Sequence, residues 1–439
     1  MDREICRTLL GELWGSDAPG KVIRALTGFG GRFGGTQEEA QAAQFIAQKM
    51  LEYGLEEVHL ESFPIQGWKR GPATLKTISP QRREFPAIAL PYSPASQVEG
   101  ELVSVNQGLP EQFQEVDVKG KIVMASSDTP DHYPRWVHRE EKYSLAVEQG
   151  AIGFVFVNHY PGCLPVTGSL RSGKTAELPG VGVSRETGWA LERMLVQGPV
   201  SLELEVQAEA VPASSQNVVG YLNADSQLGE IVVCAHYDGH DIAQGALDNG
   251  AGVTVLLELA RVLGPLRDRF PRRITFIAFG AEEIGLIGSQ VYVRDHELSD
   301  VIAVLNLDGA GRARNMRAVV NGFSQLGQLI ADTASSLGAR VTVDPRLSIA
   351  SDHWPFVEQG IPGCQFSPDT GRGRGWGHTP ADTLDKVDVR DIRENASLLA
   401  LLILRLAEGK TIIPRTDPRQ IAQRVRAQGL ERLVNWIRL

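Results

Sequence analysis

The chain has 439 residues, with 44 Lys plus Arg against 53 Asp plus Glu, and a formal net charge of -9. This length predicts two or three domains, since one domain usually contains roughly 100 to 200 residues. The acidic balance argues against a nucleic-acid partner. The first residues carry charges and no apolar run is long enough to span a bilayer, so we expect no membrane contact and a cytoplasmic location.

The four cysteines are scattered and show no CxxC spacing: Cys6, Cys163, Cys234 and Cys364. This pattern is typical of small buried residues in a reducing compartment, and it argues against a disulfide framework or a thiolate metal site. A metal site in this chain would therefore use nitrogen and oxygen ligands.

The N-terminal part predicts a helix over residues 6–26, a Gly-rich turn and a second helix that begins near residue 37. In the second helix Glu38 and Glu39 occupy the first turn and Gly54 can end it. Short β-rich pieces and two helical pieces follow over residues 92–208, which indicates an inserted domain. We therefore expect a main domain formed by residues 1–91 and 209–439.

After residue 209, strands alternate with helices, as in the strand IVVCAH, the helix GVTVLLELARVL and the strand RITFIAFG. The residues AEEIGLIGSQVYVRDH predict another helix. This alternation predicts an α/β fold with a mixed, largely parallel sheet that helices cover on both faces. Ligands then bind at the carboxyl ends of the strands. The basic segment 415–439 is predicted to be helical. We expect it to pack within the chain or to form a subunit contact in a homo-oligomer.

Side chains that bind metals follow several of these strands, namely His236, Asp248, Glu283, Asp308 and His378, with Glu282 beside one of them. Two divalent ions and one hydroxide would balance the three carboxylates of this ligand set. A single zinc ion would be over-neutralised and crowded, because a catalytic zinc usually keeps about three protein ligands. A paired-metal centre makes water a nucleophile at neutral pH, so the pattern favours a two-zinc hydrolase.

His236 and Asp238 are two positions apart at a strand end, so both can point to one side, and Asp238 can hold the ring nitrogen that does not bind metal. Taken alone, this H-x-D is more typical of a polar surface loop. Asp248 precedes a Gly-containing helix start, where it could bridge two cations. The alternative for Asp248 is a simple N-cap.

Adjacent carboxylates at the end of a buried strand repel each other unless cations neutralise them, so Glu283 can ligate while Glu282 acts on the attacking water. An exposed, acid-rich helix start is the alternative for this pair. Asp308 follows an apolar strand and precedes two glycines, where a turn-forming Asp-Gly is the alternative. His378 follows a Gly/Arg loop and precedes Thr379 and Pro380.

Other polar residues carry weaker signals. His353 could stabilise an oxyanion or simply pack in the core, and Arg372 and Arg374 could meet a substrate carboxylate, although an exposed loop is favoured. We expect surface or structural roles for the remaining histidines, which are His59, His132, His138, His159, His240 and His296.

Together these motifs resemble the di-zinc exopeptidases of the MH clan, a group that includes bacterial leucyl aminopeptidases, carboxypeptidase Q and glutamate carboxypeptidase II. The pattern H-x-D, D-[DN], E-E, Asp after a strand and a late H-T covers most of the chain. The resemblance implies that His236 and Asp308 hold one zinc, that Glu283 and His378 hold the other and that Asp248 bridges them. It also implies that Glu282 is the general base and that Asp238 supports His236, and residues 92–208 resemble a protease-associated (PA) domain.

We therefore expect a zinc metallopeptidase with a peptide substrate and two Zn2+ per chain, which Mn2+ or Co2+ could replace. An aminopeptidase that uses Glu282 as general base is favoured. The H-x-D loop is closer to carboxypeptidase Q, so a carboxypeptidase or dipeptidase on the same site is the alternative. A glutaminyl cyclase-like enzyme and a non-catalytic binding protein are less favoured.

Overall fold

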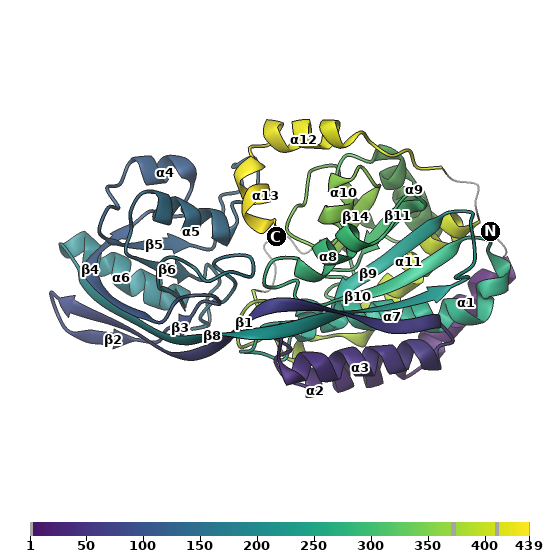
Figure 1. The fold of residues 1–439 in the computed structure, drawn as a ribbon, viewed down its shortest axis with the longest axis horizontal. Helices are drawn as coiled ribbons and strands as arrows, with labels where there is room; N and C mark the ends of the chain where they lie inside the picture. Colours follow the sequence, from purple (N-terminus) through teal and green to yellow (C-terminus); the bar gives the residue numbers. More distant parts are fainter. Residues whose placement is uncertain (1–2, 370–374, 409–411, 439) are drawn as a thin grey trace. The chain divides into compact units, whose positions relative to one another are not determined.

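The computed structural model describes residues 3–369, 375–408 and 412–438, which form two compact units (Figure 1). The first unit comprises Met1–Pro64, Ser214–Gly377 and Asp382–Ala427. The second unit comprises Ile65–Ala213, His378–Ala381 and Gln428–Leu439. Two long strands, β1 (Glu56–Ser79) and β8 (Ser201–Leu222), contribute residues to both units. The contact units divide after Pro64 and after Ala213, and the domain boundaries expected at 91/92 and 208/209 stay a prediction.

The sheet of the first unit has the order β13 (Val341–Asp344), β12 (Met316–Val319), β14 (Gly363–Pro368), β11 (Val301–Asn306), β9 (Glu230–His236), β10 (Arg273–Phe279) and β8. The central neighbours β10, β9, β11 and β14 run parallel to one another, and β12 is parallel to β13. The pairs β12 with β14 and β10 with β8 are antiparallel. The predicted mixed, largely parallel sheet is thus confirmed.

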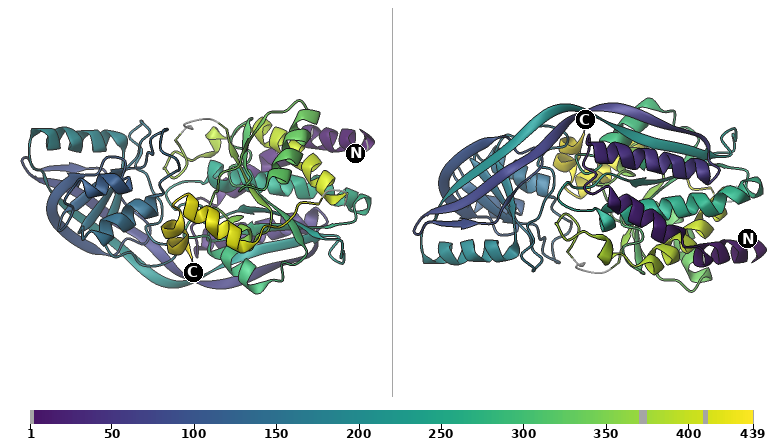
Figure 2. Two further views of the ribbon diagram at one scale, coloured as in Figure 1. Left: turned by 90° about the horizontal axis from the view of Figure 1, so that it is seen from above. Right: turned by 90° about the horizontal axis from the view of Figure 1, so that it is seen from below.

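Every residue of the central strand β9 is buried, as expected for a strand that is covered on both faces. Val232 and Cys234 share a face with Tyr292 of α8 (Ile287–Asp295) and Phe356 of α10 (Trp354–Glu358). The helices α7 (Ala251–Leu263) and α11 (Val389–Ala407) also contact β9. Figure 2 shows α2 (Ala18–Gly28) and α3 (Gln37–Glu52) beside α7. Helices therefore cover both faces of the sheet.

The predicted helix over residues 6–26 is two helices in the structure, α1 (Arg3–Gly15) and α2. Ser16 and Asp17 separate them, and Pro19 lies in the first turn of α2, a position that suits proline. In α3, Thr36 accepts a hydrogen bond from the Glu39 amide, and Gly54 follows the helix with φ of +81°. The predicted start and end of this helix are both confirmed.

The predicted helix over residues 281–296 is wrong in its first part, because α8 begins only at Ile287. Residues 280–286 form a turn in which Ala281 and Leu286 adopt positive φ angles of 58° and 57°. The sequence also left the short helix α10, the strand β14 and the buried helix α11 unassigned. The remaining helix of this sheet, α9 (Ser324–Ser336), lies where it was expected.

The second unit has its own sheet, with the order β8, β4 (Ser96–Ser104), β5 (Ile122–Ser126), β6 (Gly153–Val157), β7 (Gly180–Val183) and β3 (Ile88–Ala89). Strands β4 to β7 run parallel, and β1 pairs with β2 (Arg83–Phe85). Its helices are α4 (Pro110–Gln114), α5 (Arg139–Glu148) and α6 (Arg185–Gln197). Tyr143 and Phe154 lie in a buried core that belongs to this unit alone.

The C-terminal segment is helical as predicted, with α12 (Pro418–Ala427) in the first unit and α13 (Glu431–Ile437) in the second. Cys234 and Cys364 are buried, whereas Cys163 is exposed and Cys6 is half-buried, and all four are free thiols. Among the described helices, none combines the length and the apolar composition that crossing a membrane requires.

Candidate metal centre

The predicted site residues of the first unit collect at one edge of its sheet. His236 is the last residue of β9, Glu282 and Glu283 follow β10, and Asp308 follows β11. His236 pairs in register with Phe279 of β10, and Cys234 pairs with Asn306 of β11. The three strands are parallel neighbours, so their carboxyl ends bring these side chains together.

Asp238 is completely buried and links two of these strand ends. One carboxylate oxygen lies 3.5 Å from Nδ1 of His236. The backbone amides of Glu282 and Glu283 each donate to Asp238 over 3.1 Å. Asp238 therefore orients the ring of His236 and also shapes the turn that carries the two glutamates, which excludes the exposed-loop alternative for the H-x-D motif.

Asp248 lies in a short turn, Ala246–Gly250, and has non-helical backbone angles. The N-cap of α7 is Gly250, two residues later, so Asp248 is not the N-cap of that helix. Asp382 fixes the turn by accepting hydrogen bonds from the amides of Leu247 and Asp248 over 2.7 and 2.9 Å. The carboxylate of Asp248 therefore does not cap α7, and it lies beside His236.

The contacts of His236 have the spacing of shared metal ligands. Its Nε2 lies 3.4 Å from Oδ1 of Asp248 and 3.7 Å from Oδ1 of Asp308, which is longer than ordinary N–H···O hydrogen bonds. Two ligand atoms on one tetrahedral zinc, each about 2.0 to 2.1 Å from the ion, lie roughly 3.3 Å apart. These atoms are therefore arranged as a metal ion would require.

Two overlapping groups in the first unit could each hold an ion. Ligand atoms of His236, Asp248 and Glu283 lie within 4.8 Å of one another, and so do those of His236, Glu282 and Asp308. Glu283 is buried, and Glu282 is half-buried in a turn, so the pair is not an exposed helix start. Asp308 is also half-buried and is not a simple surface turn residue.

The electrostatics of the cluster favour a cation. Burial alone would lower the pKa of His236, but Glu282 and the carboxylates of Asp238, Asp248 and Asp308 outweigh burial and raise that pKa well above its usual value. Burial also raises the pKa of Glu282 well above its usual range, and neighbouring carboxylates add to that increase. A cluster that attracts protons so strongly also stabilises a bound metal ion. These residues therefore suit a metal site.

Two arginines in the site were not predicted. Arg312 donates to Asp248, and its Nη2 lies 3.4 Å from Oδ1 of Asp308. Arg32 is buried and donates to the backbone oxygens of Tyr237, Gln244 and Gly245 over 2.7 to 2.9 Å, so it holds the loop between the H-x-D motif and Asp248. A lone arginine in a loop gives no sequence signal, although the Gly-rich turn around Arg32 marked a tightly folded segment.

Asp308 has two further partners that the sequence did not indicate. The hydroxyl of Ser351 and the amide nitrogen of Gln365 donate to its Oδ2 over 2.7 and 2.9 Å. These bonds leave Oδ1 facing Nε2 of His236 and Nη2 of Arg312. His353, the residue two positions after Ser351, is completely buried, and burial lowers its pKa to about 4, which favours the packing alternative over an oxyanion role.

His378 belongs to the second unit by its contacts. Its backbone oxygen accepts a hydrogen bond from the Thr167 amide over 2.8 Å, and its Nδ1 lies 3.3 Å from the Thr167 oxygen. The preceding residue, Gly377, belongs to the first unit, and a Cβ added there would lie 3.5 Å from Oδ2 of Asp248. The role of His378 as a ligand stays a prediction. Arg372 and Arg374 lie outside the described residues.

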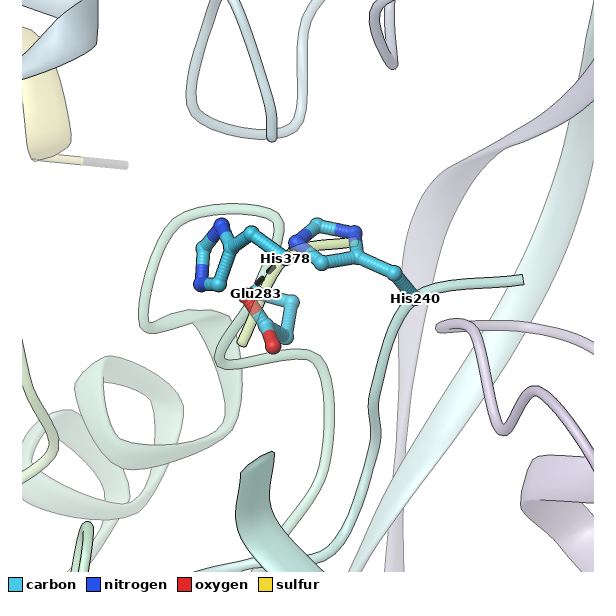
Figure 3. Close-up of side chains that lie close together, drawn as sticks. All are labelled: His240, Glu283 and His378. Atoms are coloured by element: carbon cyan, nitrogen blue, oxygen red, sulfur yellow. Dashed lines mark ion pairs between the residues drawn. The ribbon is translucent and has the colours of Figure 1, made fainter. Parts of the chain in front are cut away.

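The sequence left either a surface or a structural role open for His240. The structure excludes the surface role, since only 4% of the residue is exposed. Its Nε2 lies 3.0 Å from Oε2 of Glu283, the ion pair drawn in Figure 3. No motif marks this histidine, but its position in the loop between His236 and Asp248 was the available signal.

A mixed α/β sheet with histidine and carboxylate ligands at the ends of its parallel strands, and with a spare glutamate beside them, defines a metal-dependent hydrolase. The comparisons with known proteins agree. The model of peptidase family M28 matches residues 217–403, and the PA domain model matches residues 98–191.

The relatives cover nearly the whole chain. Aminopeptidase YwaD from Bacillus subtilis is 30% identical over 410 residues, which are 89% of this chain and 84% of that protein. Carboxypeptidase Q from Bos taurus is 24% identical over 88% of this chain and 84% of its own length. The solved structure of BSAP, a zinc aminopeptidase from Bacillus subtilis, has a TM-score of 0.69 at 27% identity, with 89% of this chain and 94% of that chain covered. The chain belongs to peptidase family M28, and it carries an inserted PA domain.

Proposed function

We propose that this protein is a metal-dependent aminopeptidase that removes N-terminal residues from peptides and binds two zinc ions per chain. The observation that carries the proposal is the pair of overlapping ligand groups at the ends of β9, β10 and β11. In the arrangement that the family resemblance implies, His236 and Asp308 would hold one ion, Glu283 and His378 would hold the other, and Asp248 would serve both. Mn2+ or Co2+ could replace zinc, because nitrogen and carboxylate ligands suit all three ions.

Two ions bound there supply Lewis-acid polarisation of the scissile carbonyl and a water of lowered pKa. The chain's own residues then move the proton. Glu282 lies beside His236 and Asp308 but is not needed as a ligand, so its carboxylate can take a proton from the attacking water. Glu282 then gives that proton to the leaving amine. Asp238 keeps His236 oriented and holds the amide of Glu282, so it couples the position of the base to that of a ligand.

The choice between an aminopeptidase and a carboxypeptidase rests on the relatives. The aminopeptidases YwaD and BSAP are 30% and 27% identical to this chain, and carboxypeptidase Q is 24% identical. The second candidate is therefore a carboxypeptidase or dipeptidase on the same site, which the H-x-D loop favours. A glutaminyl cyclase-like enzyme would have no use for the second ligand group. A binding protein would have no use for Glu282 as a base.

Two further proposals rest on sequence patterns. The scattered cysteines favour a cytoplasmic location. The basic helical segment at the C-terminus favours a homo-oligomer.

Blocked substrates test the proposed polarity. We expect zinc-loaded protein to hydrolyse leucine p-nitroanilide and a tripeptide amide, and to leave an N-acetylated tripeptide intact. Release of a residue from the N-acetylated tripeptide, with none from the tripeptide amide, would establish the carboxypeptidase instead. Activity confined to dipeptides with both termini free would establish a dipeptidase. Metal analysis of the same samples should give close to two zinc ions per chain.

A further inference from the structure

His240 lies in the metal centre, although it is not one of the five predicted ligands. It lies in the loop between His236 and Asp248, two residues after Asp238. Phe33 stacks on its ring with centroids 6.3 Å apart and an interplanar angle of 29°. The amide of the preceding residue, Gly239, donates to the Arg32 oxygen over 3.0 Å. These contacts fix the position of the ring.

The fixed ring presents Nε2 to Glu283 at 3.0 Å. Figure 3 shows the imidazole directed at the carboxylate. A separation of this size is compatible with a hydrogen bond, and it is also close to the roughly 3.3 Å expected for two ligand atoms on one zinc ion. Glu283 is itself within 4.8 Å of ligand atoms of Asp248 and His236.

We propose that Nε2 of His240 is an additional ligand of the metal ion that Glu283 and Asp248 bind. This inference rests on the metal pair of the proposed function. With His240 added to Glu283 and Asp248, the first unit alone would supply three ligands to that ion, which is the usual number of protein ligands for a catalytic zinc. His378 then adds to a set that is already sufficient to hold the ion.

The additional imidazole makes the two ions chemically unequal. One ion has His236 with the carboxylates of Asp308 and Asp248. The other has His240 with Glu283, Asp248 and, by prediction, His378. Two imidazoles favour Zn2+ over the oxygen-preferring Mn2+. We therefore expect manganese to exchange more readily into the first position than into the second.

The test compares His240→Gln and His240→Phe with a matched control, His296→Gln. His296 also lies in the first unit, stacks on an aromatic ring, that of Tyr292, and contacts a carboxylate, Glu61, at 3.0 Å. It is half-buried and lies outside the metal centre. His240→Phe retains an aromatic ring against Phe33, so it separates the loss of nitrogen from a loss of packing.

The first measurement is zinc content after dialysis of the full-length protein against a series of zinc buffers. We expect both His240 variants to bind one of the two ions at least 10- to 100-fold more weakly than the wild type, because even removal of groups that only support ligands has effects of that size. His296→Gln should match the wild type. Wild-type affinity for both ions in the His240 variants would overturn the proposal.

The second measurement distinguishes a ligand from a residue that only hydrogen-bonds to Glu283. In protein loaded with cadmium-113 and labelled with nitrogen-15 histidine, we expect scalar coupling between one cadmium ion and Nε2 of His240. Absence of that coupling, with couplings from His236 intact, would also overturn the proposal. Both measurements read metal binding alone, so a protein that binds two ions without cleaving peptides would contradict the proposed function and leave this inference standing.

Discussion

In the metal centre, carboxylates outnumber cationic side chains, and the region is largely shielded from water. Asp238, Asp248, Glu282, Glu283 and Asp308 lie together, and the guanidinium groups of Arg32 and Arg312 offset only part of their charge. Burial of uncompensated carboxylates is costly, so the cluster depends on bound cations or protons. The same shortage of positive charge that destabilises the metal-free centre gives the metal-loaded centre its affinity.

Glu282 is the residue whose replacement best separates chemistry from metal binding. Glu282→Gln keeps the size of the side chain and removes the proton acceptor, so we expect turnover to fall by about 10²- to 10⁴-fold with zinc content unchanged. Initial rates on leucine p-nitroanilide together with metal analysis provide the check. Glu61→Gln, outside the site, serves as the control. Wild-type turnover in Glu282→Gln would show that another group is the base.

Glu39 is expected to make the stability of the first unit depend on pH. It is completely buried, and its pKa is raised to about 8, chiefly by burial and then by the charge of Asp238. The carboxyl group accepts hydrogen bonds from the Gly35 amide and the Ser215 hydroxyl over 2.6 and 2.5 Å. Between its unfolded pKa of about 4.5 and its folded pKa of about 8, the folded state binds the extra proton. The wild type therefore loses stability as pH rises through this window.

Glu39→Gln cannot titrate, so the stability of the variant relative to the wild type should rise across the same window. We expect a relative gain of about 1 to 3 kcal/mol in the free energy of unfolding between pH 5 and pH 8. Urea unfolding of chelator-treated protein at several pH values measures it. Parallel pH profiles for the two proteins would show that Glu39 is ionised in the folded state.

Only part of the site was predictable at the level of single residues. His236, Glu283 and Asp308 could be predicted because apolar strands end beside them, and Asp248 could be predicted because it precedes a Gly-containing helix start. His240 and Arg312 could not, because their partners, Glu283 and Asp248, are distant in the sequence and meet them only through the parallel pairing of β9, β10 and β11.

At the level of elements, the strand ends set the position of each ligand, and the turns that follow set its direction. Strands β9 to β11 were predictable because each is a short, continuous apolar run. The start of α8 was not, because residues 281–286 are also compatible with a helix. Asp238 decides the outcome by accepting hydrogen bonds from the amides of Glu282 and Glu283, a long-range contact that local sequence does not show.

Close packing of α7 beneath the site explains Gly252. A Cβ there would collide with the Leu307 oxygen and with the side chain of Asn249, the residue after Asp248. We expect Gly252→Ala to lower the free energy of unfolding by about 1 to 3 kcal/mol and to weaken metal binding, because Leu307 precedes Asp308.

Gly11→Ala is the matched control for that change, since Gly11 also lies within a helix, α1, and a Cβ added there has no atom within 4 Å. This variant should gain about 0.5 to 1 kcal/mol from the better helix propensity of alanine. Chemical denaturation of both variants measures the two effects. A stabilised Gly252→Ala protein would mean that α7 can move away from β11 without cost.

At the scale of the whole molecule, the two units have separate cores, and the ligand groups around His236 lie in the first unit. Asp248, Glu283 and Asp308 lie in the first unit, whereas Tyr143 and Phe154 stabilise the second unit without any predicted ligand beside them. A ligand that binds only the folded state stabilises it by about 2.7 kcal/mol when its free concentration is 100 times its dissociation constant. Zinc should therefore stabilise the first unit in particular.

Hydrogen exchange with and without a chelator can resolve this difference along the chain. We expect removal of zinc to reduce protection in β9, β10 and β11 and to leave β5 and β6 of the second unit unchanged. The segment 378–381 is the informative exception, because it groups with the second unit through Thr167 and yet carries the predicted ligand His378. If His378 binds metal, protection in this segment should fall together with that of the first unit. Protection that instead stays constant there, as in β5 and β6, would remove His378 from the ligand set and leave His240 as the histidine beside Glu283.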